Sequence, residues 1–485
     1  MRVRWVGGVC AAVCILFATL AGAAERDLRL IEASKRGDAP AVKALVSAGV
    51  DVNARAGDGG TALHWASNQD SIAIVDMLLR KGANVNAATD LGITPLWIAA
   101  NNSSAPMIAR LLEAGADPNI APPTEGSPLM VAARRGNAEA AKALLARGAD
   151  PNMRETSRGQ TALMWAVSER HPEVVRLLLA AHADVKARSN SSMQRVVLCC
   201  QLYEGDEEGD ATIPEGGFTP LFFAAQDGDV ETVKLLVAAG ADVNDSAPDG
   251  ASPLVVAAHA GQSAIVAALL EAGADPNAAG AGYTALHVAA LRGDVAMARA
   301  LLEHGANPNA RQQKGSPTKR VRSGHALDHR LVGATPFILA VRACQYDVMR
   351  LLAAKGADPS LTVDDGRNAL MVLAGPGTQE EPILPESRAA EAAKLAVQLG
   401  TPPSQASATG DTALHVAATR RRDLLVQALV DSGAAINARN RKGQTPLTAA
   451  LTPPPPQKGT GLTEEYEALK STSTAALLRK LGAKT

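Results

Sequence analysis

The sequence predicts an all-α repeat solenoid, on the evidence of a recurring phrase and of the composition. The phrase that begins Thr61-Ala-Leu-His returns at Thr94, Ser127 and Thr161, after 33, 33 and 34 residues. It returns less evenly at Thr219, Ser252, Thr284, Thr335, Asn368, Thr412 and Thr445. A self-similar period of this length indicates stacked supersecondary units. Aromatic residues are 3% of the chain and apolar residues 47%, which suits thin helix pairs that bury their apolar faces against neighbouring units.

Each unit is expected to contain two helices and an outward hairpin. In the unit that begins at Thr284, the hydroxyl of this residue can cap the first helix, and Pro often follows it in sister units. Gly293 turns the chain into a second helix whose apolar residues, such as Leu301, have a spacing of three to four residues. Gly305 then supplies a left-handed C-cap, and Asn307 starts the hairpin that leads to the next unit.

These units resemble the ankyrin repeat family at almost every repeat, because segments such as GADPN, GADVN and GANVN stand beside the Thr-Pro-Leu-His phrases. The resemblance implies stacked helix-turn-helix repeats with projecting β-hairpin fingers and a concave side that binds proteins. Residues 25–57 lack the phrase and are interpreted as an N-terminal capping repeat, and residues 471–485 as a C-terminal cap. The eleven phrases and the first cap predict about twelve repeats within residues 25–485.

Four insertions interrupt the period. Those at residues 188–217 and 311–333 follow a second helix and therefore lengthen fingers, whereas those at residues 376–387 and 453–470 separate the two helices of one repeat. Residues 204–215 contain six acidic and no basic residues, and residues 311–330 contain six basic residues and one acidic residue. Each finger insertion is either a solvated loop or a recognition element beside the groove.

Residues 1–24 have the features of a secretory signal peptide of bacterial type. Arg2 and Arg4 precede an apolar run from Val6 to Leu20, and Ala21-Gly22-Ala23 fits a cleavage site. An uncleaved anchor is the alternative, although the run is short for a spanning helix. No later stretch is long and apolar enough to span a bilayer. We therefore expect an exported chain, periplasmic in the first instance and secreted as the alternative.

Charge and motifs narrow the classes of function. Removal of the signal leaves 46 basic against 49 acidic residues, which favours neither nucleic acid nor an anionic membrane surface as partner. The sequence lacks G-x-S-x-G, H-E-x-x-H and a Walker A loop, so no catalytic, metal or cofactor residues are predicted. The leading hypothesis is a monomeric, non-enzymatic scaffold of the cell envelope that binds an unknown protein partner. A secreted effector that binds a host or competitor protein is the second hypothesis.

The cysteines and the histidines of the phrases were the remaining candidates for chemistry. Cys199 and Cys200 lie in a strand-like run inside the first long finger and are a possible redox pair, through a labile vicinal disulfide. Two ordinary thiols or an intermolecular bridge are the alternatives, and Cys344 stands where a turn glycine is usual. For His64, His287 and His415, the family resemblance implies local hydrogen bonding at a helix start. These three histidines are therefore expected to be structural residues.

The expected binding surface follows from the resemblance, since family contacts cluster on finger tips and on the two positions that end the first helix. Three apolar residues, Ile93, Phe218 and Tyr283, occupy finger positions that are usually solvent-accessible, where they either anchor a partner or pack on neighbouring fingers. The pattern is interrupted at Asn368 and Gly375. By register, the positions that end the first helices are Asn68, Gln69, Asn101, Asn102, Arg134, Arg135, Ser168, Glu169, Gln226, Asp227, His259, Leu291, Arg292, Arg342, Thr419 and Arg420.

Overall fold

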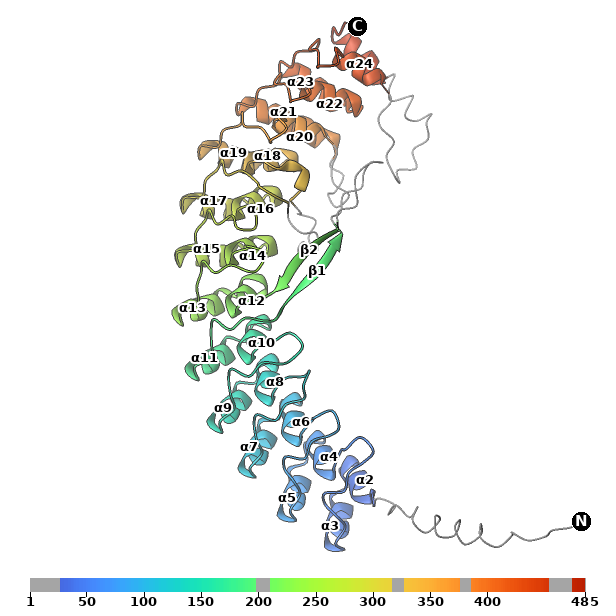
Figure 1. The fold of residues 1–485 in the computed structure, drawn as a ribbon, viewed down its shortest axis with the longest axis vertical. Helices are drawn as coiled ribbons and strands as arrows, with labels where there is room; N and C mark the ends of the chain where they lie inside the picture. The colour runs from blue at the N-terminus through green and yellow to red at the C-terminus, as the bar shows by residue number, and fades with distance from the viewer. Residues whose placement is uncertain (1–26, 198–209, 316–326, 376–384, 453–472, 485) are drawn as a thin grey trace, which may run out of the picture. The chain divides into compact units, whose positions relative to one another are not determined.

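The computed structural model describes residues 27–197, 210–315, 327–375, 385–452 and 473–484. The chain divides into two compact units, Met1–Asp184 and Val185–Thr485. Within each unit the predicted helix pairs follow one another along the chain (Figure 1), so the all-α repeat solenoid is confirmed. The signal peptide expected over residues 1–24 lies outside the described residues.

In the N-terminal unit, the helices alternate between two stacks (Figure 1). The first helices of successive repeats contact one another in series and bury their Leu and Ala side chains between them. These first helices are α2 (Arg29–Lys35), α4 (Ala62–Asn68), α6 (Pro95–Asn101), α8 (Pro128–Arg135) and α10 (Ala162–Ser168). The second helices are α3 (Ala39–Ser47), α5 (Ile72–Arg80), α7 (Ala105–Glu113), α9 (Ala138–Ala146) and α11 (Pro172–Ala180).

The C-terminal unit repeats this arrangement. Its first helices are α12 (Pro220–Asp227), α14 (Pro253–Ala260), α16 (Ala285–Arg292), α18 (Pro336–Arg342), α20 (Ala369–Ala374), α22 (Ala413–Thr419) and α24 (Pro446–Leu451). Its second helices are α13 (Val230–Ala238), α15 (Ser263–Glu271), α17 (Val295–Glu303), α19 (Tyr346–Ala354), α21 (Glu386–Gln398) and α23 (Asp423–Asp431), followed by a helix over residues 473–480.

The recurring phrase starts the first helices as expected. The Thr94 hydroxyl accepts a hydrogen bond from the backbone N–H of Trp97 at 3.2 Å, and Pro95 follows at the first helical position. A backbone N–H at a helix start has no partner within the helix, so this cap stabilises the helix by about 1 kcal/mol. The next residue, Leu96, is 1% exposed and points into the stack. The same phrase therefore supplies both the N-cap of the first helix and a buried residue of the core.

The first long finger forms a β-hairpin in the C-terminal unit. Strand β1 (Ser191–Val197) pairs antiparallel with β2 (Asp210–Gly216), with Ser191 opposite Gly216 (Figure 1). The ladder continues at the finger base, where the Ser189 N–H donates to the Phe218 carbonyl at 2.9 Å. This insertion therefore extends a finger, as the period predicted. Residues 198–209, which include Cys199 and Cys200, lie outside the described residues.

The second long finger keeps the ordinary finger pairing at its base. The Gln312 N–H donates to the Ala334 carbonyl at 2.8 Å, and the Gly333 N–H donates to the Gln312 carbonyl at 2.7 Å. A short 3-10 helix, His329–Leu331, precedes this pairing. Three of the six basic residues of this insertion, Lys319, Arg320 and Arg322, lie within residues 316–326, outside the described residues.

The boundary predicted for the third insertion needs a correction. Residues 386 and 387, expected in a loop, form the first turn of α21, which begins after Pro385 and is 13 residues long. The Glu386 carboxylate accepts hydrogen bonds from the backbone N–H groups of Leu424 at 2.8 Å and Leu425 at 3.3 Å. The extra turn is therefore fixed by a contact with the start of the next repeat's second helix. Residues 376–384 and 453–472 lie outside the described residues.

Candidate protein-interaction surface

In the N-terminal unit, the ends of the first helices form a solvent-facing row. The side chains of Asn68, Gln69, Asn102, Arg135 and Glu169 are exposed, and those of Asn101, Arg134 and Ser168 are half-buried. Side-chain amides in this row bridge consecutive repeats, since Gln69 donates to the Lys35 carbonyl at 3.0 Å and Asn102 to the Asn68 carbonyl at 3.1 Å. These bonds hold the row in place before any partner arrives, which lowers the entropic cost of binding.

In the C-terminal unit, the same register positions are less uniform. Gln226 and Asp227 are exposed, and Arg292, Thr419 and Arg420 are half-buried. Three positions predicted for the groove are instead buried, namely His259 at 9%, Leu291 at 6% and Arg342 at 8% exposed. The register rule is therefore wrong for these three as accessible contact residues. For Arg342 and His259, a residue from a neighbouring element covers the position.

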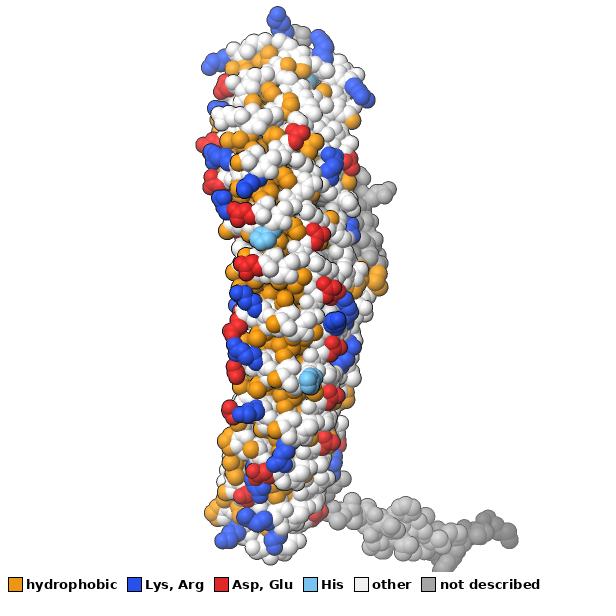
Figure 2. All heavy atoms as spheres, turned by 90° about the vertical axis from the view of Figure 1, so that its left-hand side faces the viewer, with side chains coloured by type: hydrophobic (Ala, Val, Ile, Leu, Met, Phe, Trp, Pro, Cys, Tyr) orange, Lys and Arg blue, Asp and Glu red, His pale blue; other side chains and the backbone are white. Residues whose placement is uncertain are grey.

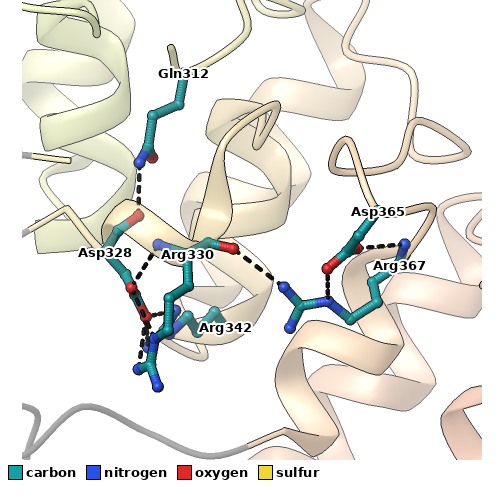
Figure 3. A network of polar contacts seen from close by, with 6 residues as sticks. All are labelled: Gln312, Asp328, Arg330, Arg342, Asp365 and Arg367. Atoms are coloured by element: carbon teal, nitrogen blue, oxygen red, sulfur yellow. Dashed lines mark hydrogen bonds and ion pairs between the residues drawn. The ribbon is translucent and has the colours of Figure 1, made fainter. Parts of the chain in front are cut away.

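Arg342 is buried because the second long finger supplies a counter-charge (Figure 3). Both terminal nitrogens of its guanidinium lie 3.2 Å from Oδ2 of Asp328, whose side chain is 4% exposed. Arg330 pairs with the same carboxylate at 3.0 Å, and Gln312 donates to the Asp328 carbonyl at 2.7 Å. Although burial opposes ionisation, the two guanidiniums lower the pKa of Asp328 to about 2. The network fixes the root of the finger on α18.

Two of the apolar finger residues are half-buried and the third is not accessible. Ile93 and Phe218 are half-buried, and the Phe218 ring stacks on Phe222 with centroids 5.3 Å apart. Tyr283 is 0% exposed, so its interpretation as an accessible finger residue is wrong. Its hydroxyl lies 3.1 Å from Nε2 of His259, and the two rings meet edge to face. This contact with the preceding repeat buries both residues.

Several other apolar residues of the surface were not predicted from the sequence. Leu91, two residues before Ile93, is 74% exposed, and Met193 on β1 is 64% exposed. Half-buried Trp65 and Trp165 lie on first helices, at the position directly after the fourth residue of the phrase. The phrase locates this position in the sequence, but only the exposed fraction of the Trp side chains shows that they face outward. Large aromatic and apolar side chains of this kind are frequent anchors of protein interfaces.

The histidines of the phrases have the structural role that the resemblance implied. Nδ1 of His287 lies 3.2 Å from the backbone nitrogen of Thr284, and Nε2 lies 3.2 Å from the Ala334 carbonyl. The Thr284 N–H can only donate, so Nδ1 is the acceptor and Nε2 carries the proton. Burial lowers the pKa of His287 to about 4. His64 and His415 make the equivalent bonds to Thr61 and Ile93, and to Thr412 and Gln444.

Chemistry of other kinds finds little support in the described part of the chain. Cys344 is 0% exposed, its backbone has φ of +52°, and burial raises the pKa of its thiol. Within the described ranges, no cluster of three or more His, Cys, Asp or Glu side chains is arranged to hold a metal ion. Among the helices that the structure describes, none has both the length and the apolarity needed to cross a membrane.

Comparison with known proteins agrees with this geometry. A family model described as "Ankyrin repeats (3 copies)" matches residues 30–122, 106–189, 194–280, 221–312 and 279–363, and one described as "Ankyrin repeat" matches residues 409–441. The chain belongs to the ankyrin repeat family. Ankyrin repeats generally mediate protein–protein interaction, and proteins built from them are typically not enzymes.

Individual relatives of this ankyrin repeat protein match only parts of it. It is 33% identical over 85 residues to "Ankyrin repeat and KH domain-containing protein mask-1" of Caenorhabditis elegans, which is 15% of this chain and 3% of that protein. It is similar to the human ASB11 ankyrin repeat domain at 29% identity and a TM-score of 0.41, over 51% of this chain and 98% of the other.

Proposed function

We propose that this ankyrin repeat protein is an exported scaffold of the cell envelope that binds a protein partner through the ends of its first helices and its fingers. The observation that supports this most is the row of exposed polar side chains from Asn68 to Glu169, which inter-repeat hydrogen bonds hold in place. Exposed Leu91 lies on a finger of the same unit and supplies an apolar contact. A rigid surface of this composition favours protein over small-molecule partners.

The face formed by the second helices has a different character. Figure 2 shows acidic and basic side chains interspersed with apolar ones along that face. Ion pairs on the second helices include Arg110 with Asp76 of the preceding repeat at 2.5 Å and Arg176 with Glu173 within α11 at 2.8 Å. Charges that are satisfied internally have less to gain from a partner, so we assign binding to the first-helix side.

Site-specific photo-crosslinking in the native cell tests this assignment. A crosslinking amino acid placed at Asn102 or Arg135 is expected to yield a discrete adduct with one partner protein. The same substitution at the exposed second-helix residues Arg80 or Lys142 serves as the matched control and is expected to yield none. Adducts that form from the second-helix positions alone, or from neither set, would refute the assignment.

Export rests on residues 1–24 and needs its own test. If the signal peptide is cleaved after Ala21-Gly22-Ala23, N-terminal sequencing should show that the purified protein begins at Ala24 or Glu25. Fractionation should then place the protein in the periplasm under the scaffold proposal. Recovery from the culture medium would favour the secreted effector instead, and an intact N-terminus with cytoplasmic recovery would exclude both.

A further inference from the structure

We infer that the N-terminal unit recognises an extended acidic segment of its partner, through two pairs of cations on the first-helix row. Lys35 and Arg36 end helix α2, and Arg134 and Arg135 end helix α8. This inference rests on the proposed function, because it assigns the partner's chemistry at the same surface. The positive charge of this row contrasts with the net charge of the whole chain, which is slightly negative.

Uncharged groups hold three of the four cations, and the side chain of the fourth, Arg36, is exposed. Nζ of Lys35 lies 4.9 Å from the centroid of the Trp65 ring, and Cζ of Arg134 lies 4.9 Å from that of Trp165. Arg135 donates to the side-chain oxygen of Asn101 at 3.0 Å. Among the described residues, none of the four takes part in a salt bridge. Aromatic faces and amides orient a cation without neutralising it, so each remains available to a carboxylate.

Acidic side chains near the row do not cancel this charge. Glu32 lies one turn earlier on α2, and Asp70 and Glu169 follow the ends of α4 and α10. The four cations against these three acidic residues leave an excess of one positive charge on this face.

The spacing defines the length of the segment. The two cation pairs are three repeats apart, and packed helices lie about 8–10 Å apart, so the pairs are separated by roughly 25–30 Å. An extended peptide advances about 3.3 Å per residue, so acidic residues about eight positions apart would meet both pairs. The amides of Asn68, Gln69 and Asn102 lie between the pairs and suit the peptide backbone. Four cations over this distance are too sparse to follow a nucleic acid backbone, which is far more densely charged.

A structural explanation makes a different prediction. Cations near helix C-termini interact favourably with the helix dipole, so these residues could act on stability alone. In that case, replacing these cations by acidic residues would lower the stability of the fold without a specific effect on the binding of acidic ligands. Binding and stability therefore have to be measured on the same variants.

The test uses the mature chain and a fluorescein-labelled 10-residue peptide with two glutamates at each end and a neutral centre, so that the two glutamate pairs are eight positions apart. Its twin carries glutamine in place of glutamate. We expect the glutamate peptide to bind at least about tenfold more tightly at low salt, and Arg134→Glu with Arg135→Glu to remove about tenfold of its affinity. The matched control, Arg80→Glu with Lys142→Glu on the second helices, should change it less than about twofold. Circular dichroism verifies that both double variants remain folded.

Three results would overturn the inference. These are equal affinity for the twin peptides, equal losses in the two double variants, and tighter binding of a 12-nucleotide single-stranded DNA than of the glutamate peptide. A selection from a random-peptide library shows whether only the acidic specificity is wrong or whether the proposed binding surface is wrong as well. Selected peptides that lack acidic residues but compete with crosslinking at Asn102 would overturn the acidic specificity and still support the binding surface. Crosslinked adducts confined to Arg80 and Lys142 would refute both proposals.

Discussion

Protonation of a buried histidine should make the C-terminal unit sensitive to mild acid. His287 is 0% exposed, and its Nδ1 accepts the Thr284 N–H at 3.2 Å. A proton on Nδ1 would face that donor and place a charge in the core. Burial accordingly lowers the pKa of His287 to about 4, against about 6.5 in an unfolded chain. The neutral form is therefore the one that the folded unit requires.

The sign and size of the effect follow from these two values. Between pH 6.5 and pH 4 the unfolded chain binds a proton that the folded chain does not, so the free energy of unfolding falls as the pH is lowered. Between pH 7 and pH 5, this site alone should contribute a loss of about 1.8 kcal/mol, and roughly 3 kcal/mol once the pH is below 4. Above pH 7 the contribution is constant.

The assay compares the parent protein with His287→Met. Met stands at this position in three other repeats, and the Met130 sulfur accepts the Ser127 N–H at 3.3 Å, so the cap has a native precedent. Urea unfolding followed by circular dichroism at 222 nm should show a pH 7 to pH 5 loss that is about 1.8 kcal/mol smaller in His287→Met. The exposed His304, changed to Gln, is the matched control and should keep the parental loss. An equal loss in parent and His287→Met would refute the reasoning.

Three further predictions concern other contacts of the repeats. Asn277→Ala removes the bond to the Gly305 carbonyl at 3.0 Å and that from the Asn307 N–H at 2.7 Å, so the free energy of unfolding should fall by about 1–3 kcal/mol; an unchanged urea midpoint would contradict this. Arg342→Met leaves the Asp328 carboxylate with less compensation in a buried site, and thermal unfolding should reveal a loss of about 3–5 kcal/mol, whereas a loss below about 1 kcal/mol would show that the pair is dispensable. Ser103 is exposed and has a left-handed backbone conformation with φ of +59°, so Ser103→Gly should raise the free energy of unfolding by roughly 0.5–1 kcal/mol. A lower free energy of unfolding in urea would contradict this.

The sequence predicted the fold because each repeat carries its own local determinants. Thr94 and Pro95 start a helix, and Gly305 has the left-handed conformation, φ of +88°, that was expected after a second helix. Such signals act within a few residues and recur in every unit, so one repeat explains the others. The roles of His64 and His287 were implied by the family resemblance, and the bonds to Thr61 and Thr284 confirm them.

The environment of individual surface positions could not be predicted in this way. Arg342 and His259 are buried by Asp328 and Tyr283, which come from a neighbouring finger and from the next repeat. Register alone treats every first-helix end as equivalent, since it contains no information about what each neighbour contributes. The half-buried Trp65 and Trp165 could not be identified for the same reason, because only packing distinguishes them from the buried Val131 at the corresponding position.

Hydrogen–deuterium exchange with a bound partner tests the central claim, that binding takes place on the first-helix side. The mature chain would be compared free and in complex with the protein identified by crosslinking. Added protection is expected over residues 61–70, 94–103 and 127–136, which contain the ends of α4, α6 and α8, with no change over residues 72–80 and 105–113 of the second helices. Protection confined to the second helices would contradict the account.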